Sequence, residues 1–422
     1  MYRELFWPVL APSMLVGVAA GATVPVSVLA ALQLGASPAL GSLIIAMVGA
    51  AALLTTVPAG RFIDRVGDRR AMLLATGGGA VCTALTVAAL VWGGPGALAL
   101  FVVSVVLRAP VMSVWNLSRQ ALVAGHVPTA QLGRAMTALG GTMRAGNLVG
   151  PLLAAALLLV LPMWSVFVLS MACALLALAI LYSRAGSALD VAARELAARE
   201  LAARDVADTG TAEDAVRPVD PARAAAAASA VRWRAVVLSG VAVAALAMAR
   251  VAQPVGVQLW GVHLGLTESV ISLLVAVGAA VELVMMFPGG HLKDHLGRAP
   301  VLVLCLAVYG TGFVLMPLLP HLTGMVVAVL VMAVGNGLGA GINMTIGADL
   351  SPAANRARFL GIWALFSNGG VLAGPAAMSG LVAVGGVRLG LLGIAVAALA
   401  GAAWMAAWAR VADLPRGVGR GA

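Results

Sequence analysis

The sequence is poor in charge and almost devoid of lysine. Asp, Glu, Lys and Arg together make up 10% of the 422 residues, whereas 62% are hydrophobic, and Lys293 is the single lysine. A soluble protein of this length needs far more charge to cover its surface. This scarcity excludes a soluble globular protein and indicates an integral membrane protein.

Cysteine is also scarce, and enzyme motifs are missing. Cys82, Cys173 and Cys305 each stand alone in an apolar run, so we expect buried thiols, with no disulfide framework and no metal site. The sequence contains no Gly-rich phosphate loop ending in Gly-Lys-Ser/Thr, no His-Glu-x-x-His and no Gly-x-Ser-x-Gly. We therefore predict a protein that is not an enzyme, needs no cofactor and is not driven by ATP within this chain.

The positive charges are distributed as in a membrane protein. The formal net charge is +10, which is also common in nucleic-acid-binding proteins, but the arginines lie in short loops between apolar runs and form no basic face. Cytoplasmic loops of membrane proteins collect Arg and Lys, and the basic loops here fall on the side of both termini. We predict no nucleic-acid partner, a location in the cell membrane and cytoplasmic termini.

Twelve apolar segments are long enough to cross a bilayer, which takes about 20 residues of helix. They run roughly over residues 7–32, 37–59, 71–93, 96–121, 134–160, 163–184, 233–260, 266–289, 299–319, 322–348, 358–383 and 386–410. The expected fold is an all-α membrane protein with two six-helix bundles, residues 1–184 and 233–422, joined by a cytoplasmic linker at 185–232. A repeat of five residues within the linker predicts a solvated helix, with a partner-binding helix as the alternative.

A charged turn separates the second and third segments, and an incomplete copy of it recurs in the second half. The residues that form the first motif are Gly60, Asp64, Arg65, Gly67, Arg69 and Arg70, and those of the copy are Gly290, Asp294, Gly297 and Arg298. The spacing resembles the signature loop between the second and third membrane helices of the major facilitator superfamily. Matched motifs at matched positions of two halves strengthen the resemblance.

This resemblance implies two pseudo-symmetric bundles that rock about a central site, as in a secondary active transporter. In the family, the loop helps to hold the cytoplasmic side closed. The resemblance therefore implies that Asp64 faces the start of the eleventh helix near Arg358, with Arg119 as a second partner. Since the copy around Asp294 is incomplete, we expect the first-half loop to be the stronger latch.

A glycine and proline motif on the fifth helix bears on the direction of transport. Its residues are Gly146, Gly150 and Pro151, and their counterparts on the eleventh helix are Gly370, Gly374 and Pro375. The first set resembles the motif associated with exporters, especially antiporters, although glycines four residues apart also serve simply to pack helices closely, and proline permits a bend. We predict proton-coupled efflux of a drug, metabolite or sugar, with uptake of a nutrient or organic anion as the alternative.

Four charged residues are expected well inside the membrane, where charge is costly and marks functional sites. They are Glu282, Arg108, Arg144 and Arg250. A lone carboxylate such as Glu282 can carry a proton as the cavity faces each side in turn; the alternative is a static Arg to Glu pair that locks the bundle. Three arginines favour an anionic or amphipathic substrate, unless their long side chains reach toward the interface instead.

Other residues near the expected midpoints suit a cavity for a medium-sized organic molecule. They are Met112, Trp115, Asn147, Gln253, Asn336, Asn343 and Asn368. Each of them alone is more often a helix-packing residue than a ligand contact. The predicted protein is a monomer whose partners are a small-molecule substrate, protons and the lipid bilayer.

Overall fold

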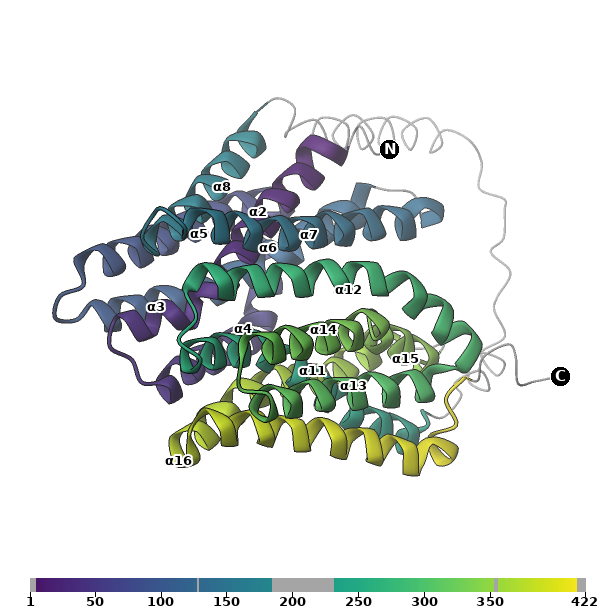
Figure 1. The fold of residues 1–422 in the computed structure, drawn as a ribbon. Helices are drawn as coiled ribbons and strands as arrows, with labels where there is room; N and C mark the ends of the chain where they lie inside the picture. Colours follow the sequence, from purple (N-terminus) through teal and green to yellow (C-terminus); the bar gives the residue numbers. More distant parts are fainter. Residues whose placement is uncertain (1–4, 127–128, 184–230, 353–355, 416–422) are drawn as a thin grey trace, which may run out of the picture.

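The computed structural model describes residues 5–126, 129–183, 231–352 and 356–415, without side chains for 124–126, 129–134, 136–137 and 356–358. The first half contains η1 (Phe6–Leu10), α2 (Ala11–Thr23), η2 (Val24–Val26), α3 (Ser27–Gln33), α4 (Pro38–Val66), α5 (Asp68–Trp92), α6 (Ala97–His126), α7 (Thr129–Leu157) and α8 (Trp164–Tyr182). The second half contains α11 (Trp233–His263), α12 (Glu268–Leu296), α13 (Arg298–Leu318), α14 (Leu322–Leu338), α15 (Ile342–Leu350) and α16 (Arg356–Ala412). Every regular element in these ranges is a helix, which confirms the all-α class (Figure 1). The predicted linker, apart from residues 231 and 232, lies outside the described part.

The described chain crosses the membrane as often as the sequence predicts. Ten helical stretches are long and apolar enough to span a bilayer. The last of them, Phe359–Ala412, contains two helices that meet at Gly385 and Gly386. α7 is not among the ten although it is 29 residues long, because it carries Arg144 and Asn147 in its middle. With α16 counted as two helices and α7 included, the described chain has twelve membrane helices.

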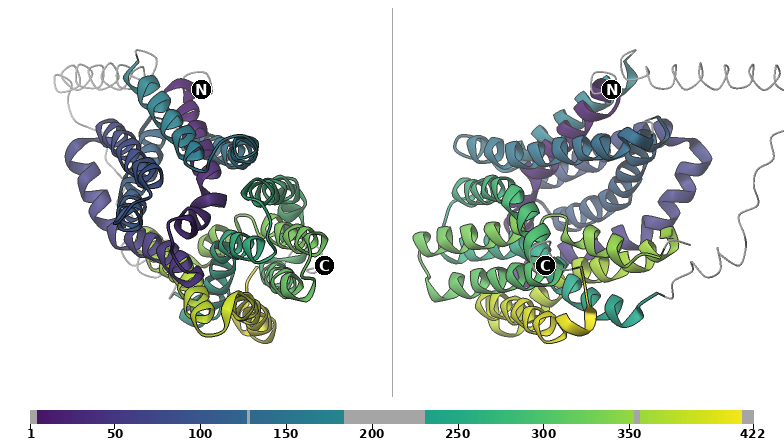
Figure 2. Two further views of the ribbon diagram at one scale, coloured as in Figure 1. Left: turned by 60° about the vertical axis from the view of Figure 1, so that its left-hand side comes forward. Right: turned by 90° about the vertical axis from the view of Figure 1, so that its right-hand side faces the viewer.

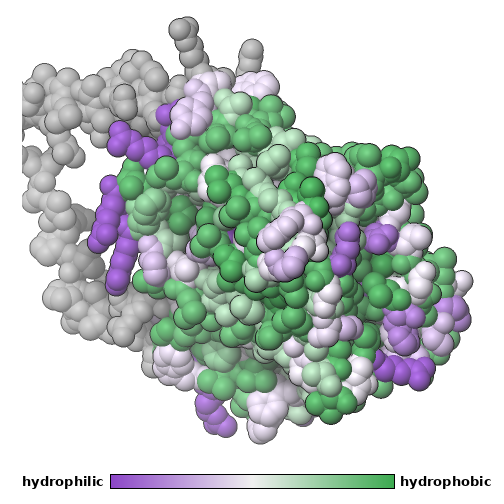
Figure 3. Space-filling view, turned by 90° about the vertical axis from the view of Figure 1, so that its left-hand side faces the viewer, coloured by the Kyte–Doolittle hydropathy of each residue, from purple (hydrophilic) through white to green (hydrophobic). Residues whose placement is uncertain are grey.

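The outer surface of the bundle is apolar. Large hydrophobic side chains point away from the core, and Leu54, Val81 and Phe287 are 75%, 60% and 73% exposed. In the view from the left-hand side of Figure 1, hydrophobic residues cover most of the surface and hydrophilic residues form a few separate groups (Figure 3). Such a surface is stable only against lipid, because bare apolar patches of this extent are rare on soluble monomers.

The two halves repeat the same local structures, and Figure 2 shows them as separate groups, coloured purple to blue and green to yellow. Gly35 and Gly265 follow the first helix of each half with φ of 89° and 71°. Gly67 and Gly297 separate the second and third helices with φ of 84° and 89°. Residues with a Cβ rarely adopt such φ values. We name the two ends of the bundle the Gly35 face, which carries Gly35 and Gly265, and the Gly67 face, which carries Gly67 and Gly297.

The halves are joined at the Gly35 face. The amide of Gln258 on α11 accepts from the Val28 N–H at 2.9 Å and donates to the Val24 carbonyl at 3.0 Å. Ser269 Oγ donates to the carbonyl of Ala155, and Ser379 Oγ to that of Ala39, both at 2.8 Å. These are all the hydrogen bonds between the halves among the described residues. The described residues therefore close the structure at the Gly35 face, and they form no hydrogen bond between the halves at the Gly67 face.

The glycine and proline motif packs helices in both halves alike. A Cβ on Gly146 would lie 2.6 Å from the carbonyl oxygen of Met14 and from the amide nitrogen of Val18, so α7 touches the backbone of α2. A Cβ on Gly374 would lie 2.5 Å from the carbonyl oxygen of Met248, so α16 touches α11 in the same way. Gly150, Pro151, Gly370 and Pro375 are likewise buried. Close helix packing is thus sufficient to explain the motif.

This packing makes a stability prediction. We expect Gly374→Ala to destabilise the bundle by about 1–3 kcal/mol, because the added methyl group overlaps a backbone carbonyl that cannot move freely. Gly380→Ala on the same helix is the matched control, since a Cβ there meets nothing within 4 Å. Thermal unfolding in detergent compares the two variants. Equal melting temperatures would contradict the close-packing role of Gly374.

Three expectations about the helices are corrected. The motif from Gly60 to Arg70 is not a turn: α4 continues to Val66 and α5 starts at Asp68, so Gly67 alone makes the bend. The predicted helix 322–348 is broken between Leu338 and Ile342, where Gly341 has φ of 78°. The first predicted helix is interrupted at Val24–Val26, because Pro25 has no N–H to donate.

Candidate functional site

Two adjoining cavities lie between the halves, and we name each after a charged residue in its lining. The Glu282 lobe has a volume of about 400 Å³, and the Arg108 lobe has a volume of about 500 Å³. Residues of both halves line each lobe, and Ala20, Val24, Arg250 and Pro254 line both. Volumes of about 300–1,000 Å³ are typical of small-molecule sites. Of the predicted cavity residues, Asn147, Arg250, Gln253, Glu282 and Asn336 line the Glu282 lobe, and Arg108, Met112 and Arg250 line the Arg108 lobe. Arg144 lines neither lobe but contacts Glu282.

Glu282 on α12 contacts the other half of the molecule. Arg144 Nη1 on α7 lies 3.6 Å from Glu282 Oε1. Asn336 Nδ2 donates to Glu282 Oε2 at 2.6 Å. The side chains of Arg144 and Glu282 are 37% and 30% exposed. The ion pair therefore joins the halves, and it also remains accessible from the cavity.

Arg250 on α11 connects the two lobes to the break in the tenth membrane helix. Its Nη2 donates to the carbonyl of Asn336 at 3.4 Å. A Cβ on Gly339 would lie 2.9 Å from the same nitrogen, so the guanidinium occupies the space that a side chain at position 339 would need. Three residues further along α11, the Gln253 amide oxygen accepts from the Tyr309 hydroxyl at 2.9 Å. Arg250 is thus held at the centre of the site by the second half.

Arg108 on α6 brings an uncompensated positive charge to its lobe. Among the described residues it has no hydrogen-bond or ion-pair partner. The described lining of the Arg108 lobe contains Arg108 and Arg250 but no Asp or Glu. Both arginines line a cavity between the halves, which favours the cavity interpretation over side chains that reach to the interface.

Besides Arg144, four predicted residues line neither lobe. Trp115 is 1% exposed and lines a cavity of only about 20 Å³. Arg119, 8% exposed, stacks over its ring with the guanidinium carbon 4.7 Å from the ring centre. Asn343 accepts through its backbone carbonyl from Trp363 Nε1 at 3.0 Å, and Asn368 is half-buried. Trp115, Asn343 and Asn368 thus line neither lobe, and their role in a substrate cavity stays a prediction.

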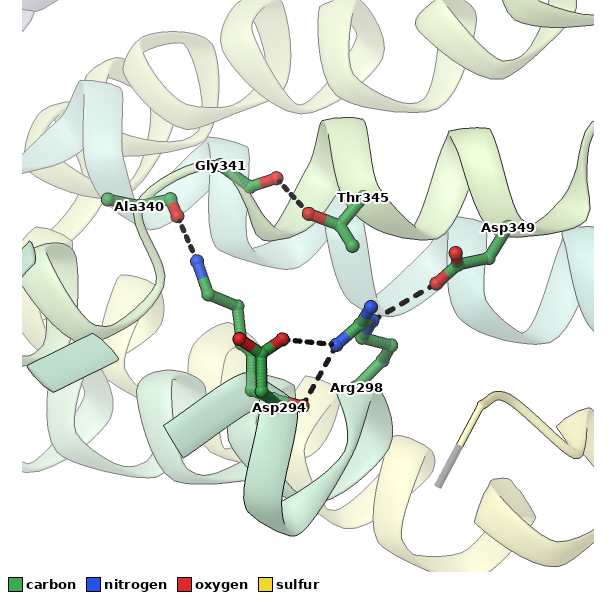
Figure 4. A network of polar contacts seen from close by, with 7 residues as sticks. Asp294, Arg298, Ala340, Gly341, Thr345 and Asp349 are labelled. Atoms are coloured by element: carbon green, nitrogen blue, oxygen red, sulfur yellow. Dashed lines mark hydrogen bonds and ion pairs between the residues drawn. The ribbon is translucent and has the colours of Figure 1, made fainter. Parts of the chain in front are cut away.

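The copied motif of the second half forms a polar network within that half (Figure 4). Arg298 Nε lies 3.1 Å from Asp349 Oδ2 on α15, and its Nη1 lies 3.4 Å from Asp294 Oδ1. Lys293 Nζ donates to the carbonyl of Ala340, which lies in the break between α14 and α15. This network fixes the end of α12 to α15, and it holds no residue of the first half.

The first-half motif differs from the second-half copy in that its acidic residue, Asp64, is not paired among the described residues. Asp64 and Arg65 are exposed, and Asp64 has no hydrogen-bond or ion-pair partner among the described residues. Arg69 Nη2 donates to the carbonyl of Leu181 at 2.7 Å. Arg119 makes no contact with Asp64, and the side chain of Arg358 lies outside the described part. The predicted latch is thus not engaged through Arg119 in this structure.

Sequence reasoning missed three polar residues of the site. Gln258 and Asn116 line the Arg108 lobe, and Tyr309 holds Gln253 from behind. Asn116 had a signal, because it follows Arg108 and Met112 at four-residue spacing and so lies on the same helix face. Gln258 and Tyr309 had none, since their roles depend on which helix lies opposite.

Comparisons with known proteins agree with this geometry. A family model described as Major Facilitator Superfamily matches residues 9–253 and 238–421. Similar solved structures include a peptide transporter POT in complex with sulfate, with 15% identity, 98% of this chain and 96% of that chain covered, and a TM-score of 0.74. Two others are of a POT family transporter, in complex with 5-aminolevulinic acid and with a thioalcohol conjugated peptide. In each case the identity is 12%, the coverage is 96% of this chain and 95% of that chain, and the TM-score is 0.71. No curated protein matches the sequence.

Proposed function

The chain belongs to the major facilitator superfamily, and we propose that it takes up a small organic molecule together with protons by alternating access. It is a membrane transporter of a small molecule and not an enzyme. What we propose is the coupling to protons, the direction of transport and the class of the substrate. We further propose that the Gly67 face lies in the cytoplasm, as the basic loops indicate.

One observation carries the proposal, namely the position of Glu282. It is the only carboxylate in the described lining of the two lobes, and its ion pair with Arg144 crosses from one half to the other. Protonation of Glu282 would cancel its charge and weaken the pair, so the proton state of one residue would bias how the halves meet. A carboxylate accessible from a cavity can exchange protons with whichever side the cavity faces.

The direction is argued from two observations. Similar structures are of a POT family transporter in complex with a thioalcohol conjugated peptide and with 5-aminolevulinic acid, and we take this likeness to favour uptake. The glycine and proline motif on α7, which suggested efflux, is explained by packing and recurs in the second half. The comparisons give efflux no support, and it remains only a prediction.

A vesicle experiment tests the proposal. Purified protein is reconstituted in vesicles that contain a pH-sensitive dye, and a panel of carboxylates, amino acids, dipeptides and neutral compounds is added outside. A transported compound is expected to carry protons inward with it, and an inward proton gradient is expected to drive its accumulation. Accumulation that is unaffected by collapse of the gradient would contradict proton coupling, and proton movement opposite to the compound would establish exchange instead.

The Asp64 motif yields a prediction for the cycle. We propose that Asp64 holds the Gly67 face together in the state that is closed at that face, because the positive N-terminal end of α16 favours a carboxylate. Asp64→Asn is then expected to slow transport. The expected change is about 2- to 30-fold, since such contacts contribute about 0.5–2 kcal/mol. Affinity should be unchanged, because Asp64 lines neither lobe.

Transport rate and equilibrium binding are measured on the same preparation. Asp294→Asn is the matched comparison, because that carboxylate already pairs within its own half. A loss of affinity without a loss of rate would rule out the latch.

A further inference from the structure

The Arg108 lobe differs in charge from the Glu282 lobe. The described lining of the Glu282 lobe contains one arginine, Arg250, and one carboxylate, Glu282, whereas that of the Arg108 lobe contains Arg108 and the shared Arg250 and no carboxylate. Arg108 comes from the first half and Arg250 from the second. An uncompensated cation in a poorly hydrated site is costly unless an anion accompanies it. The described lining of this lobe supplies no anionic partner for Arg108, so a negatively charged ligand would compensate its charge.

The hydrogen-bond donors and acceptors of the lobe are mostly used internally. Thr23, Ser27 and Ser113 donate their hydroxyl protons to carbonyls of their own helices, and the amide of Gln258 is bonded to Val24 and Val28. Asn116 has no hydrogen-bond partner among the described residues. The polar groups left for a ligand are therefore the two guanidinium groups and this one amide.

The rest of the lobe is an apolar wall. Its larger side chains come from α4, α6 and α11, and they are Ile45, Val48, Val105, Met112 and Val251. Such a wall gains from burying the hydrocarbon part of a ligand, by about 25 cal/mol per Å², and it offers nothing to a second polar group. A sugar or a strongly hydrophilic acid would lose hydrogen bonds to water there without replacement.

We propose that the transported substrate is an organic monoanion with an apolar body, such as an aromatic or branched aliphatic carboxylate, bound in the Arg108 lobe. Arg108 and Arg250 hold the carboxylate from the two halves, Asn116 donates to it, and the hydrocarbon part lies against Met112 and the α4 wall. This proposal rests on the transport function proposed above and narrows its substrate class. One monoanion that travels with the one proton of Glu282 carries no net charge.

Binding to the purified protein tests the substrate class, with benzoate, 4-methylpentanoate, lactate, benzamide and sulfate as probes. Thermal stabilisation is expected from benzoate and 4-methylpentanoate, and not from the other three. Arg108→Gln is expected to weaken benzoate binding at least about tenfold, since a hydrogen bond to a charged group contributes about 1.5–3 kcal/mol. Arg108→Lys should retain part of the affinity. Arg234→Gln, an exposed arginine near the start of α11, is the control and should bind as the wild type does.

A transport measurement tests the substrate class and the proton coupling separately. Accumulation of benzoate driven by a pH gradient, counted as the excess over protein-free vesicles because neutral benzoic acid crosses bilayers unaided, should be unaffected by a potassium diffusion potential, since no net charge crosses. If a neutral or cationic compound is instead driven by protons, the substrate class is wrong and proton coupling stands. If benzoate binds but its accumulation ignores the proton gradient, the substrate class stands and proton coupling is wrong. Binding of lactate or sulfate as tight as that of benzoate would refute the proposal that the substrate has an apolar body.

Discussion

Glu282→Gln is expected to abolish the proton-driven accumulation of substrate while leaving exchange of substrate across the membrane. An amide fills the same space as the carboxylate and keeps a polar contact with Asn336, but it cannot bind and release a proton. One pH unit corresponds to 1.36 kcal/mol, which sustains about tenfold accumulation at one proton per substrate. The variant should accumulate nothing above the external concentration at the same gradient.

The measurement compares uphill uptake with counterflow in the same vesicles. Glu268→Gln is the matched control, since Glu268 is an exposed residue in the first turn of the same helix, α12, and is expected to leave both activities unchanged. If Glu282→Gln still accumulates substrate with the gradient, Glu282 does not carry the proton. If both uptake and counterflow are lost while the protein remains folded, the Arg144 to Glu282 pair is a structural contact instead.

The number and approximate positions of the membrane helices could be predicted from the sequence because the bilayer enforces them. Apolar runs must be about 20 residues long, and glycines such as Gly67 and Gly297 stand where only a positive φ can turn the chain. The extension of α4 to Val66 could not be predicted from apolarity. Its last two turns carry the charged residues of the motif, which continue the helix beyond the apolar run.

The candidate site was predictable where a charge stood in an apolar run. Glu282, Arg108, Arg144 and Arg250 stand out because charge in the membrane needs a reason, and the structure places three of them in the lining of the two lobes and Arg144 in contact with Glu282. Uncharged residues carry no comparable signal. Asn343 and Asn368, like Asn336, are asparagines near the expected midpoints of their helices, yet of the three only Asn336 bonds to Glu282 among the described residues. That choice depends on helix rotation, which packing determines.

Gln258 is the clearest case of a role that only the fold reveals. In an uninterrupted α-helix the Val28 N–H would bond to the Val24 carbonyl. The structure instead separates these two groups at η2, and the amide of Gln258 bonds to both, at 2.9 Å and 3.0 Å. A side chain of the second half thus replaces a backbone hydrogen bond of the first half. Opening of the Gly35 face must break both contacts, and the first helix can then close its own bond.

Gln258→Leu is accordingly expected to shift the protein toward a state open at the Gly35 face. The variant leaves the buried Val28 N–H without a partner while that face is closed, and it also removes the hydrogen bond to the partly exposed Val24 carbonyl, at a cost of about 1–3 kcal/mol. This corresponds to a shift of about 5- to 150-fold between the two states. In the open state the Val28 N–H can bond to the Val24 carbonyl within the first helix, so the substitution costs little there. The substitution therefore destabilises mainly the closed state.

Spin labels at exposed positions report the shift. Gln33→Cys with His263→Cys measures the Gly35 face, and Arg65→Cys with His295→Cys measures the Gly67 face. In the Gln258→Leu background the first distance should lengthen and the second should shorten. Ser379→Ala removes a single bond between the halves and should produce a smaller shift in the same direction. Unchanged distances in Gln258→Leu, with the control also unchanged, would mean that apolar packing and not this amide closes the Gly35 face.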